Sequence, residues 1–297
     1  MSRLQANLLL LLTALIWGSS FVAQKFGAPL AGPFGFTAAR FFLGALVVLP
    51  LALAELRRGR RQGRHLSGRD RLGLLCTGSA LCCGAVLQQI GIASTSVTNA
   101  GFLTALYVPL VPIIGFVTRR AVPHPMVWPA AALSVLGTWM LSGGGPVSLA
   151  IGDAWVIASA LFWAAHIILV GLLSARTGMP TVLALVQFLI AGSVSAVIVP
   201  FVEPQALSGL WEARHAIAYV GILSVGIGFT LQSVTQRYTN AADAAIILSG
   251  ETLFAAIGGM LVLDERLTVL QFAGCAAILI AILAVQLLPV QQPASAR

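Results

Sequence analysis

Long apolar stretches follow one another along most of this chain, separated by short polar loops. Ten such stretches run from Leu4 to Pro289. A helix needs about 20 residues to cross a hydrocarbon core about 30 Å thick, and each stretch has about that length. The pattern predicts an all-α polytopic membrane protein. Its ten transmembrane helices are expected at 5–26, 34–54, 71–93, 97–118, 125–142, 152–174, 181–202, 214–237, 241–263 and 267–289.

The second five stretches repeat features of the first five in the same order. The clearest matches are Gln88 with Gln232, Trp17 with Trp163 and Pro33 with Pro180. Five spans in each half force the second half to enter the membrane from the opposite side, and such inverted repeats bind their substrates between the halves. The sequence therefore predicts two inverted five-helix repeats, at residues 1–143 and 144–297, around a central cavity.

Composition and charge distribution define the class and the orientation. The 297 residues are 58% hydrophobic and 9% charged, which excludes an ordinary soluble domain. The net charge of +8 does not indicate a nucleic-acid partner, because the arginines lie in short loops where they contact lipid headgroups. Thirteen of the 17 Lys and Arg fall on the side that holds the N-terminus, and three fall on the other side. The positive-inside rule then predicts that both termini are cytoplasmic.

Motifs for metal, nucleotide and protease chemistry are missing. The four cysteines lie inside apolar spans without metal-ligand spacing, and Lys25 is the single lysine, so no nucleotide-binding Walker lysine exists. Asp153, Asp243 and Asp264 lie near the ends of spans, where an intramembrane aspartyl protease would not have them. We therefore expect no metal, no cofactor and no enzymatic activity.

Several short segments resemble one transporter family. Trp17-Gly18-Ser19-Ser20-Phe21 with Lys25, Arg40, Ser249-Gly250-Glu251-Thr252 and Leu263-Asp264-Glu265 are similar to segments of EamA-type transporters of the drug/metabolite transporter superfamily. The chain differs from that family at Thr252, where proline is usual, and at Arg119-Arg120, where a glutamate is common. The resemblance covers nearly the whole chain. It implies a ten-helix bundle in the bacterial cytoplasmic (inner) membrane that exports amino acids or related small metabolites.

Polar and aromatic residues deep inside the spans are the candidates for substrate binding, because a polar group in hydrocarbon needs a partner. Glu251 is either a cavity carboxylate or a structural cap, and His166 is either a substrate contact or a packed core residue. Trp and Tyr normally prefer the membrane interface, so central ones indicate a pocket wall or tight packing. We predict a substrate site made by Trp17, Gln88, Tyr107, Trp163, His166, Gln232 and Glu251.

A second group of residues is expected to gate or shape the site. Arg40, inside the second span, is expected to reach the outer surface or to pair with Glu265 or Asp264. Pro109 and Pro112 remove backbone hydrogen bonds in the fourth span and are expected to bend it. Gly250 weakens the corresponding span of the second repeat. Weak points at equivalent positions of two repeats are typical of a transporter's binding site.

The resulting hypothesis is a transporter that exports small metabolites by alternating access. Amino acids are the favoured substrates, with aromatic or other large apolar side chains first. The cavity is expected to be lined by spans one, three, four, six, eight and nine. Spans five and ten, which have almost no polar residue at mid-depth, are expected at the periphery, where they are available for homodimer contacts. The alternative is a lipid-handling protein, either a flippase component or an intramembrane enzyme that modifies lipids.

Overall fold

The structure is a computed structural model that describes residues 1–95, 97–118, 123–145, 151–262 and 266–287, and all regular elements within them are helical. The helices of the first half are α1 (Arg3–Ala31), α2 (Pro33–Arg61), α3 (Gly68–Ser94), α4 (Val97–Thr104), α5 (Tyr107–Val117) and α6 (Val127–Leu141). Those of the second half are α7 (Ile151–Thr177), α8 (Pro180–Val202), α9 (Ala206–Glu212), α10 (Arg214–Tyr219), the π-helix η1 (Val220–Phe229), α11 (Thr230–Thr235), α12 (Ala241–Leu248), α13 (Gly250–Val262) and α14 (Val269–Leu287).

These helices make ten membrane crossings. Nine helical stretches of the described residues are long and apolar enough to cross a bilayer, and the shorter apolar helix α6 supplies the tenth. Three crossings are interrupted helices: α4 with α5, α12 with α13, and α10 with η1 and α11. The ten-helix prediction is confirmed. The interruption of the eighth span by a π-helix was not predicted.

The sequence signals at helix starts explain where several crossings begin. Ser2 and Gln5 form a capping box at the start of α1, with Ser2 Oγ accepting the Gln5 N–H at 3.2 Å. Pro33 and Pro180 are the first residues of α2 and α8, where a missing N–H costs nothing. Gly32, between α1 and α2, has φ +72°, a conformation that L side chains rarely adopt.

Two glutamates join α2 and α8 at both ends. The Glu203 carboxylate follows α8 and accepts the Phe34 and Gly35 N–H groups at the start of α2, at 2.9–3.1 Å. Glu55, near the end of α2, accepts the Thr181 N–H and hydroxyl at the start of α8, at 2.9 and 2.7 Å. The helices are therefore antiparallel, and a carboxylate at each helix N-terminus also interacts favourably with the helix dipole. We call these contacts the two glutamate caps.

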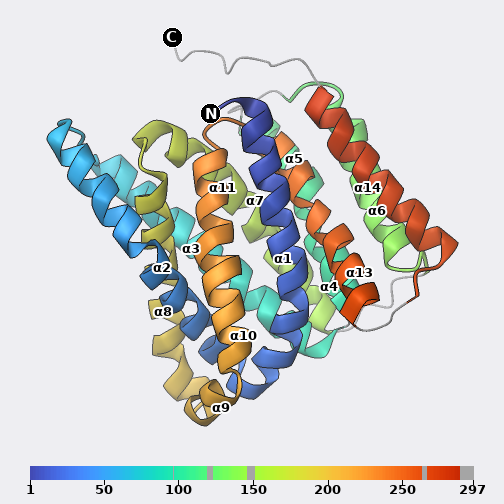
Figure 1. The fold of residues 1–297 in the computed structure, drawn as a ribbon, viewed down its shortest axis with the longest axis horizontal. Helices are drawn as coiled ribbons and strands as arrows, with labels where there is room; N and C mark the ends of the chain where they lie inside the picture. The colour runs from blue at the N-terminus through green and yellow to red at the C-terminus, as the bar shows by residue number, and fades with distance from the viewer. Residues whose placement is uncertain (96, 119–122, 146–150, 263–265, 288–297) are drawn as a thin grey trace.

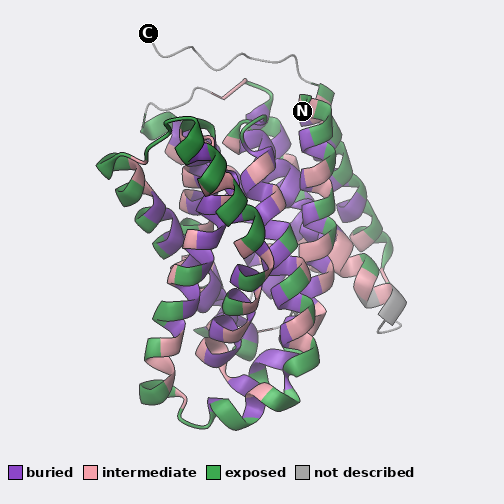
Figure 2. Ribbon diagram, turned by 60° about the vertical axis from the view of Figure 1, so that its left-hand side comes forward, coloured by how far each residue is buried: buried purple, intermediate pink, exposed green. Residues whose placement is uncertain are grey.

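The two halves interlock instead of lying apart. Helix α2 packs along α8, α3 along α7, and α1 along α13. Helices α6 and α14 pack on each other at one edge of the bundle, as Figure 1 shows, so the fifth and tenth spans are peripheral as predicted. Figure 2 shows buried positions along the inner sides of the helices and many exposed positions outside, as expected for a bundle surrounded by lipid.

The chain ends of the described bundle lie on one side. In Figure 1, α1 begins, α2 ends and α14 ends near the top of the bundle, whereas α9 lies at the bottom. An even number of crossings requires this arrangement. The arginine-rich end of α2, which includes Arg57, Arg58, Arg60 and Arg61, therefore lies on the same side as the start of α1.

Candidate functional site

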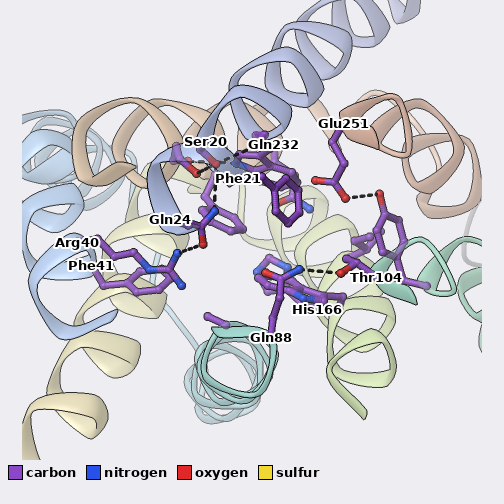
Figure 3. Close-up of a pocket in the computed structure, with 17 residues that line it drawn as sticks. Ser20, Phe21, Gln24, Arg40, Phe41, Gln88, Thr104, His166, Gln232 and Glu251 are labelled. Carbon is purple, nitrogen blue, oxygen red and sulfur yellow. Dashed lines mark hydrogen bonds between the residues drawn. The ribbon is translucent and has the colours of Figure 1, made fainter. Parts of the chain in front are cut away.

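A cavity lies between the two repeats, with walls from both. It is lined by residues of α1, α2, α3, α4, α5, α7, η1, α11 and α13. All seven residues predicted to bind substrate line it, namely Trp17, Gln88, Tyr107, Trp163, His166, Gln232 and Glu251. The predicted set of spans omitted the second span, whereas Arg40 and Phe41 of α2 also form part of the wall. Figure 3 shows these side chains converging from several helices.

The volume of the cavity is small in this conformation. The space open to the centre of a water molecule is about 50 Å³. At roughly 10–15 Å³ for each water, this space holds only a few waters. Pockets that enclose drug-sized ligands measure about 300–1,000 Å³. A substrate as large as an aromatic amino acid would therefore require the wall to open.

An aromatic cluster around Phe229 forms one side of the cavity. The Trp17 and Phe229 ring centroids are 4.6 Å apart and tilted by 48°. Trp163 stacks on Phe229 with centroids 5.9 Å apart and 13° between the planes, and His166 meets Phe229 edge-on at 5.9 Å. Offset and edge-on pairs are the favoured aromatic geometries. The cluster gives the cavity a flat apolar surface next to polar atoms.

A long hydrogen bond joins the two repeats at the cavity. The Tyr107 hydroxyl donates to Glu251 Oε1 at 3.4 Å, and both residues are buried. Their separation of 144 residues is the same offset that relates Gln88 to Gln232. Tyr107 and Glu251 therefore occupy equivalent positions of the two repeats, and these equivalent positions meet. Gln88 Nε2 donates to the Thr104 hydroxyl nearby, at 2.9 Å.

Tyr107 and Glu251 each lie where a membrane crossing is interrupted. Helix α5 begins at Tyr107, just after the break at Ala105. Pro109 has no N–H to bond the Ala105 carbonyl, and its ring clashes with that carbonyl in a continuous helix, so the fourth span breaks there. Pro112 lies inside α5. The span is therefore interrupted before Tyr107, next to Pro109, whereas α5 continues through Pro112.

The equivalent break in the second repeat has no proline. Helix α12 ends at Leu248 and α13 begins at Gly250. The Ser249 hydroxyl donates to the Ile246 carbonyl at 2.6 Å and contacts the Ser134 hydroxyl at 2.8 Å. Thr252 donates back to the Ser249 carbonyl at 2.9 Å. Hydroxyl side chains that hydrogen-bond to nearby backbone compete with the backbone hydrogen bonds of a helix. The Ser249 and Thr252 hydroxyls thus accompany the break in this span, as proline does in the first repeat.

Several buried polar atoms in the cavity wall have no hydrogen-bond partner in the described part of the chain. They are Trp163 Nε1, His166 Nδ1, both amide atoms of Gln232, and Arg40 Nε. The other His166 nitrogen, Nε2, lies 2.7 Å from Gln187 Oε1 and donates to it, because an amide oxygen only accepts. Buried polar groups in folded proteins are almost always paired with protein or water. These atoms therefore favour a cavity that holds water or a polar ligand.

One expectation was that Arg40 reaches the outer surface, and the structure does not show this. Arg40 is 5% exposed, and its Nη1 donates to Gln24 Oε1. The guanidinium also lies 5.6 Å from the centre of the Phe36 ring and 5.2 Å from that of Phe41. Its predicted partners Glu265 and Asp264 lie outside the described residues, so a gating pair with either of them stays a prediction.

Each residue from Trp17 to Phe21 contacts a neighbouring helix or lines the cavity. Trp17 Nε1 donates to the Ser224 carbonyl of η1 at 3.1 Å, and Ser19 accepts the Tyr219 hydroxyl at 2.7 Å. Gly18 lies against the backbone of Glu251 in α13. Ser20 and Phe21 line the cavity. The segment therefore fixes α1 against both η1 and α13.

Sequence reasoning missed other wall residues. Ser20 and Gln24 follow Trp17 by three and seven residues, so they share its helix face, and that spacing was an available signal. Thr104 and Phe229 carried no comparable signal, because one phenylalanine or threonine among many apolar residues does not stand out. Among the described residues no group of His, Cys, Asp and Glu is arranged to hold a metal ion.

Comparisons with known proteins agree on the kind of protein that carries this cavity. The model of the EamA-like transporter family matches residues 4–143 and 150–287. An uncharacterized transporter of Archaeoglobus fulgidus is 33% identical over 289 residues, covering 96% of this chain and 87% of its own length. The threonine/homoserine exporter RhtA of Escherichia coli strain K12 is 29% identical over 282 residues, covering 92% and 88%. The exporter of the same name from Salmonella typhimurium strain LT2 is 28% identical over 283 residues, with the same coverage.

The fold also matches a solved crystal structure. That structure is 19% identical in sequence and superposes with a TM-score of 0.78 over 96% of this chain and 98% of its own chain. At this identity the match concerns the fold alone.

Proposed function

The chain belongs to the EamA-like transporter family, and on this premise we propose that it exports amino acids through its central cavity. The observation that carries the proposal is the wall of the cavity. It combines one cation, Arg40, with one carboxylate, Glu251, and with amide and aromatic groups. A guanidinium and a carboxyl group in the same wall suit a zwitterion better than a phosphate or a nucleotide. The threonine/homoserine exporters among the relatives support the same class of substrate.

Two observations favour different amino acid side chains. The rings of Trp17, Trp163 and Phe229 offer a surface on which an aromatic or large apolar side chain stacks. The small volume and the relatives' names favour a short side chain such as that of threonine or homoserine. The preference for large side chains stays a prediction, and a direct comparison of substrates decides it.

We propose alternating access as the mechanism. The Tyr107–Glu251 contact joins the two interrupted crossings at equivalent positions of the repeats. Breaks in the backbone ladder let a half-helix move without bending the other half. Rocking of one repeat against the other would separate Tyr107 from Glu251 and open the cavity to one side at a time.

We further propose that the protein lies in the bacterial cytoplasmic membrane with both termini in the cytoplasm. The excess of Arg on the side that holds the N-terminus supports this orientation. Single cysteines in the 62–67 loop would be labelled by an impermeant maleimide from outside intact cells only if the orientation were reversed. A cysteine in the 203–205 segment is the matched control, because it is expected to be labelled from outside.

Purified protein in liposomes tests the function. Uptake of L-threonine, L-homoserine, L-phenylalanine and L-tryptophan would be measured with and without a pH gradient, against empty liposomes. We expect saturable uptake of at least one of them. Dependence on the pH gradient would indicate proton exchange, and its absence would indicate facilitated diffusion. No uptake of any amino acid, together with accelerated flip of labelled lipid, would support the lipid-handling alternative instead.

A further inference from the structure

We propose that Arg40 is the receptor for the carboxylate of the transported molecule, so that the transporter selects amino acids over the corresponding amines and amides. This inference rests on the proposed function, which it makes more specific. It concerns a residue for which the sequence had indicated a structural or gating role.

The first argument is that Arg40 is a buried cation with no counter-ion among the described residues. Its side chain is 5% exposed, and in the described part of the chain no carboxylate lies within ion-pair distance of it. Arginine stays protonated in proteins. A buried charge is strongly unfavourable unless it is paired. A ligand carboxylate would supply the missing negative charge.

The second argument concerns the unused hydrogen-bond donors. A guanidinium carries five N–H donors. The Gln24 side-chain oxygen Oε1 accepts from Nη1, and Nε has no acceptor among the described residues. Arg40 is one of the residues that line the cavity, so a molecule bound there would lie next to the guanidinium. The fork of a guanidinium matches the two oxygens of a carboxylate.

The third argument is that the guanidinium is held in place before any ligand arrives. Gln24 Nε2 donates to the Ser20 hydroxyl at 3.2 Å, and Ser20 donates to the Trp17 carbonyl at 2.8 Å. Phe36 and Phe41 lie 5.6 and 5.2 Å from the guanidinium carbon and restrict it further. A receptor whose geometry is fixed loses little entropy on binding.

The fourth argument comes from the repeat. Gln187 follows Pro180 by the same seven residues that separate Arg40 from Pro33, so the two positions are equivalent. Gln187 already accepts from His166 Nε2 at 2.7 Å. The second repeat therefore has a neutral, paired group where the first repeat has a charged group with unused donors. A role in folding common to both repeats does not explain this difference.

The positions of the charges give the cavity a direction. Figure 3 shows Arg40 and Glu251 on opposite sides of the cavity residues, with His166 and Gln88 between them. A zwitterion would align its carboxylate toward Arg40 and its ammonium group toward Glu251. An amine or amide that lacks the carboxylate would leave Arg40 without a partner.

The experiment compares two substrates that differ only in the carboxylate. Wild type, Arg40→Lys, Arg40→Gln and the control Arg214→Gln would be reconstituted in liposomes. Transport of L-threonine and L-threoninamide would be measured for each, and the pair L-phenylalanine and L-phenylalaninamide would be measured in parallel. Arg214 lies at the start of α10, where it stacks on Trp211 outside the cavity.

We expect Arg40→Gln to lose about tenfold or more of amino acid transport, as for a hydrogen bond to a charged group. Amide transport should change by about twofold or less, so the preference for the carboxylate should disappear. Arg40→Lys should restore part of the preference, and Arg214→Gln should behave as wild type. Equal loss of both members of a pair in Arg40→Gln, or an unchanged preference, would overturn the proposal.

A binding measurement keeps the two proposals separable. If wild type carries no amino acid, the proposed function fails, and Arg40 is then tested by thermal stabilisation of the purified protein with propionate and with propionamide. Stabilisation by propionate alone, lost in Arg40→Gln, would support a carboxylate receptor. No difference between the two additives would overturn it.

Discussion

Gly18 is the position where a single methyl group should disturb the site most directly. A Cβ atom there would lie 2.4 Å from the Glu251 carbonyl oxygen and 2.8 Å from the Ala255 nitrogen. Both are backbone atoms and cannot rotate away. Restoring a separation of about 3.5 Å requires α1 and α13 to move apart by about 1 Å.

The expected magnitude follows from that displacement. Overpacking of this kind costs about 1–3 kcal/mol, whereas glycine to alanine in a helix gains about 0.5–1 kcal/mol. The difference is a net loss of about 0–2.5 kcal/mol in Gly18→Ala. Its middle, about 1 kcal/mol, corresponds to a fall in Tm of about 2–4 °C for a chain of this size. Transport should fall as well, because Trp17 and Glu251 lie on the two helices that separate.

Thermal unfolding in detergent and amino acid uptake by liposomes would be measured for Gly18→Ala and for two control variants. Gly258 lies in α13 with nothing within 4 Å of its added Cβ, and the nearest atom to that of Gly101 is Thr252 Cγ2 at 3.7 Å. Gly258→Ala and Gly101→Ala should therefore keep or raise Tm. A Gly18→Ala protein with the Tm and uptake of wild type would refute the reasoning. An equal fall in all three variants would assign the effect to glycine itself and not to the contact between α1 and α13.

Two other substitutions test separate parts of the structure. Trp163→Ala removes a stacked ring from the cavity wall, so uptake of L-phenylalanine should fall about 2–10-fold more than uptake of L-threonine, as expected for a lost aromatic pair; equal losses for both would mean that the ring is structural. Glu203→Ala leaves the first N–H groups of α2 without their acceptor, which costs about 1–3 kcal/mol. Its Tm should fall below that of the control Glu212→Ala at the exposed end of α9, and an unchanged Tm would contradict a stabilising cap.

The ten-helix fold could be predicted because its main signal is strong and local. An apolar segment of about 20 residues has few alternatives to a membrane crossing. The repeat was detectable because residues at some equivalent positions have the same structural role in both halves. Pro33 and Pro180, for instance, both begin a helix. Helix ends were less predictable: α2 continues to Arg61, several residues past the apolar stretch, since arginine-rich sequence also favours a helix.

The site was predictable to the extent that its residues are unusual inside a membrane. Trp163, His166 and Glu251 stand out in apolar sequence, and all three line the cavity. Phe229 does not stand out, although it is the centre of the aromatic cluster. Whether the Arg40 side chain faces the cavity or the outer surface depends on how α2 packs against its neighbours. The spacing of residues along one helix does not determine that packing.

Differences between the repeats explain how a nearly symmetric scaffold can hold an asymmetric molecule. Glu55 and Glu203 do the same work at opposite ends of the α2–α8 pair, so the same residue type serves in both places. In the cavity the equivalent residues differ: Tyr107 faces its counterpart Glu251, and a neutral glutamine stands where the first repeat has Arg40. The first repeat therefore contributes a guanidinium and the second a carboxyl group. A site with identical residues in both repeats would bind a zwitterion equally well in two opposed orientations. Because Arg40 and Glu251 have different residues at their equivalent positions, one of the two orientations loses its partners. The divergence of the two halves is therefore what would give the site a single orientation for its substrate.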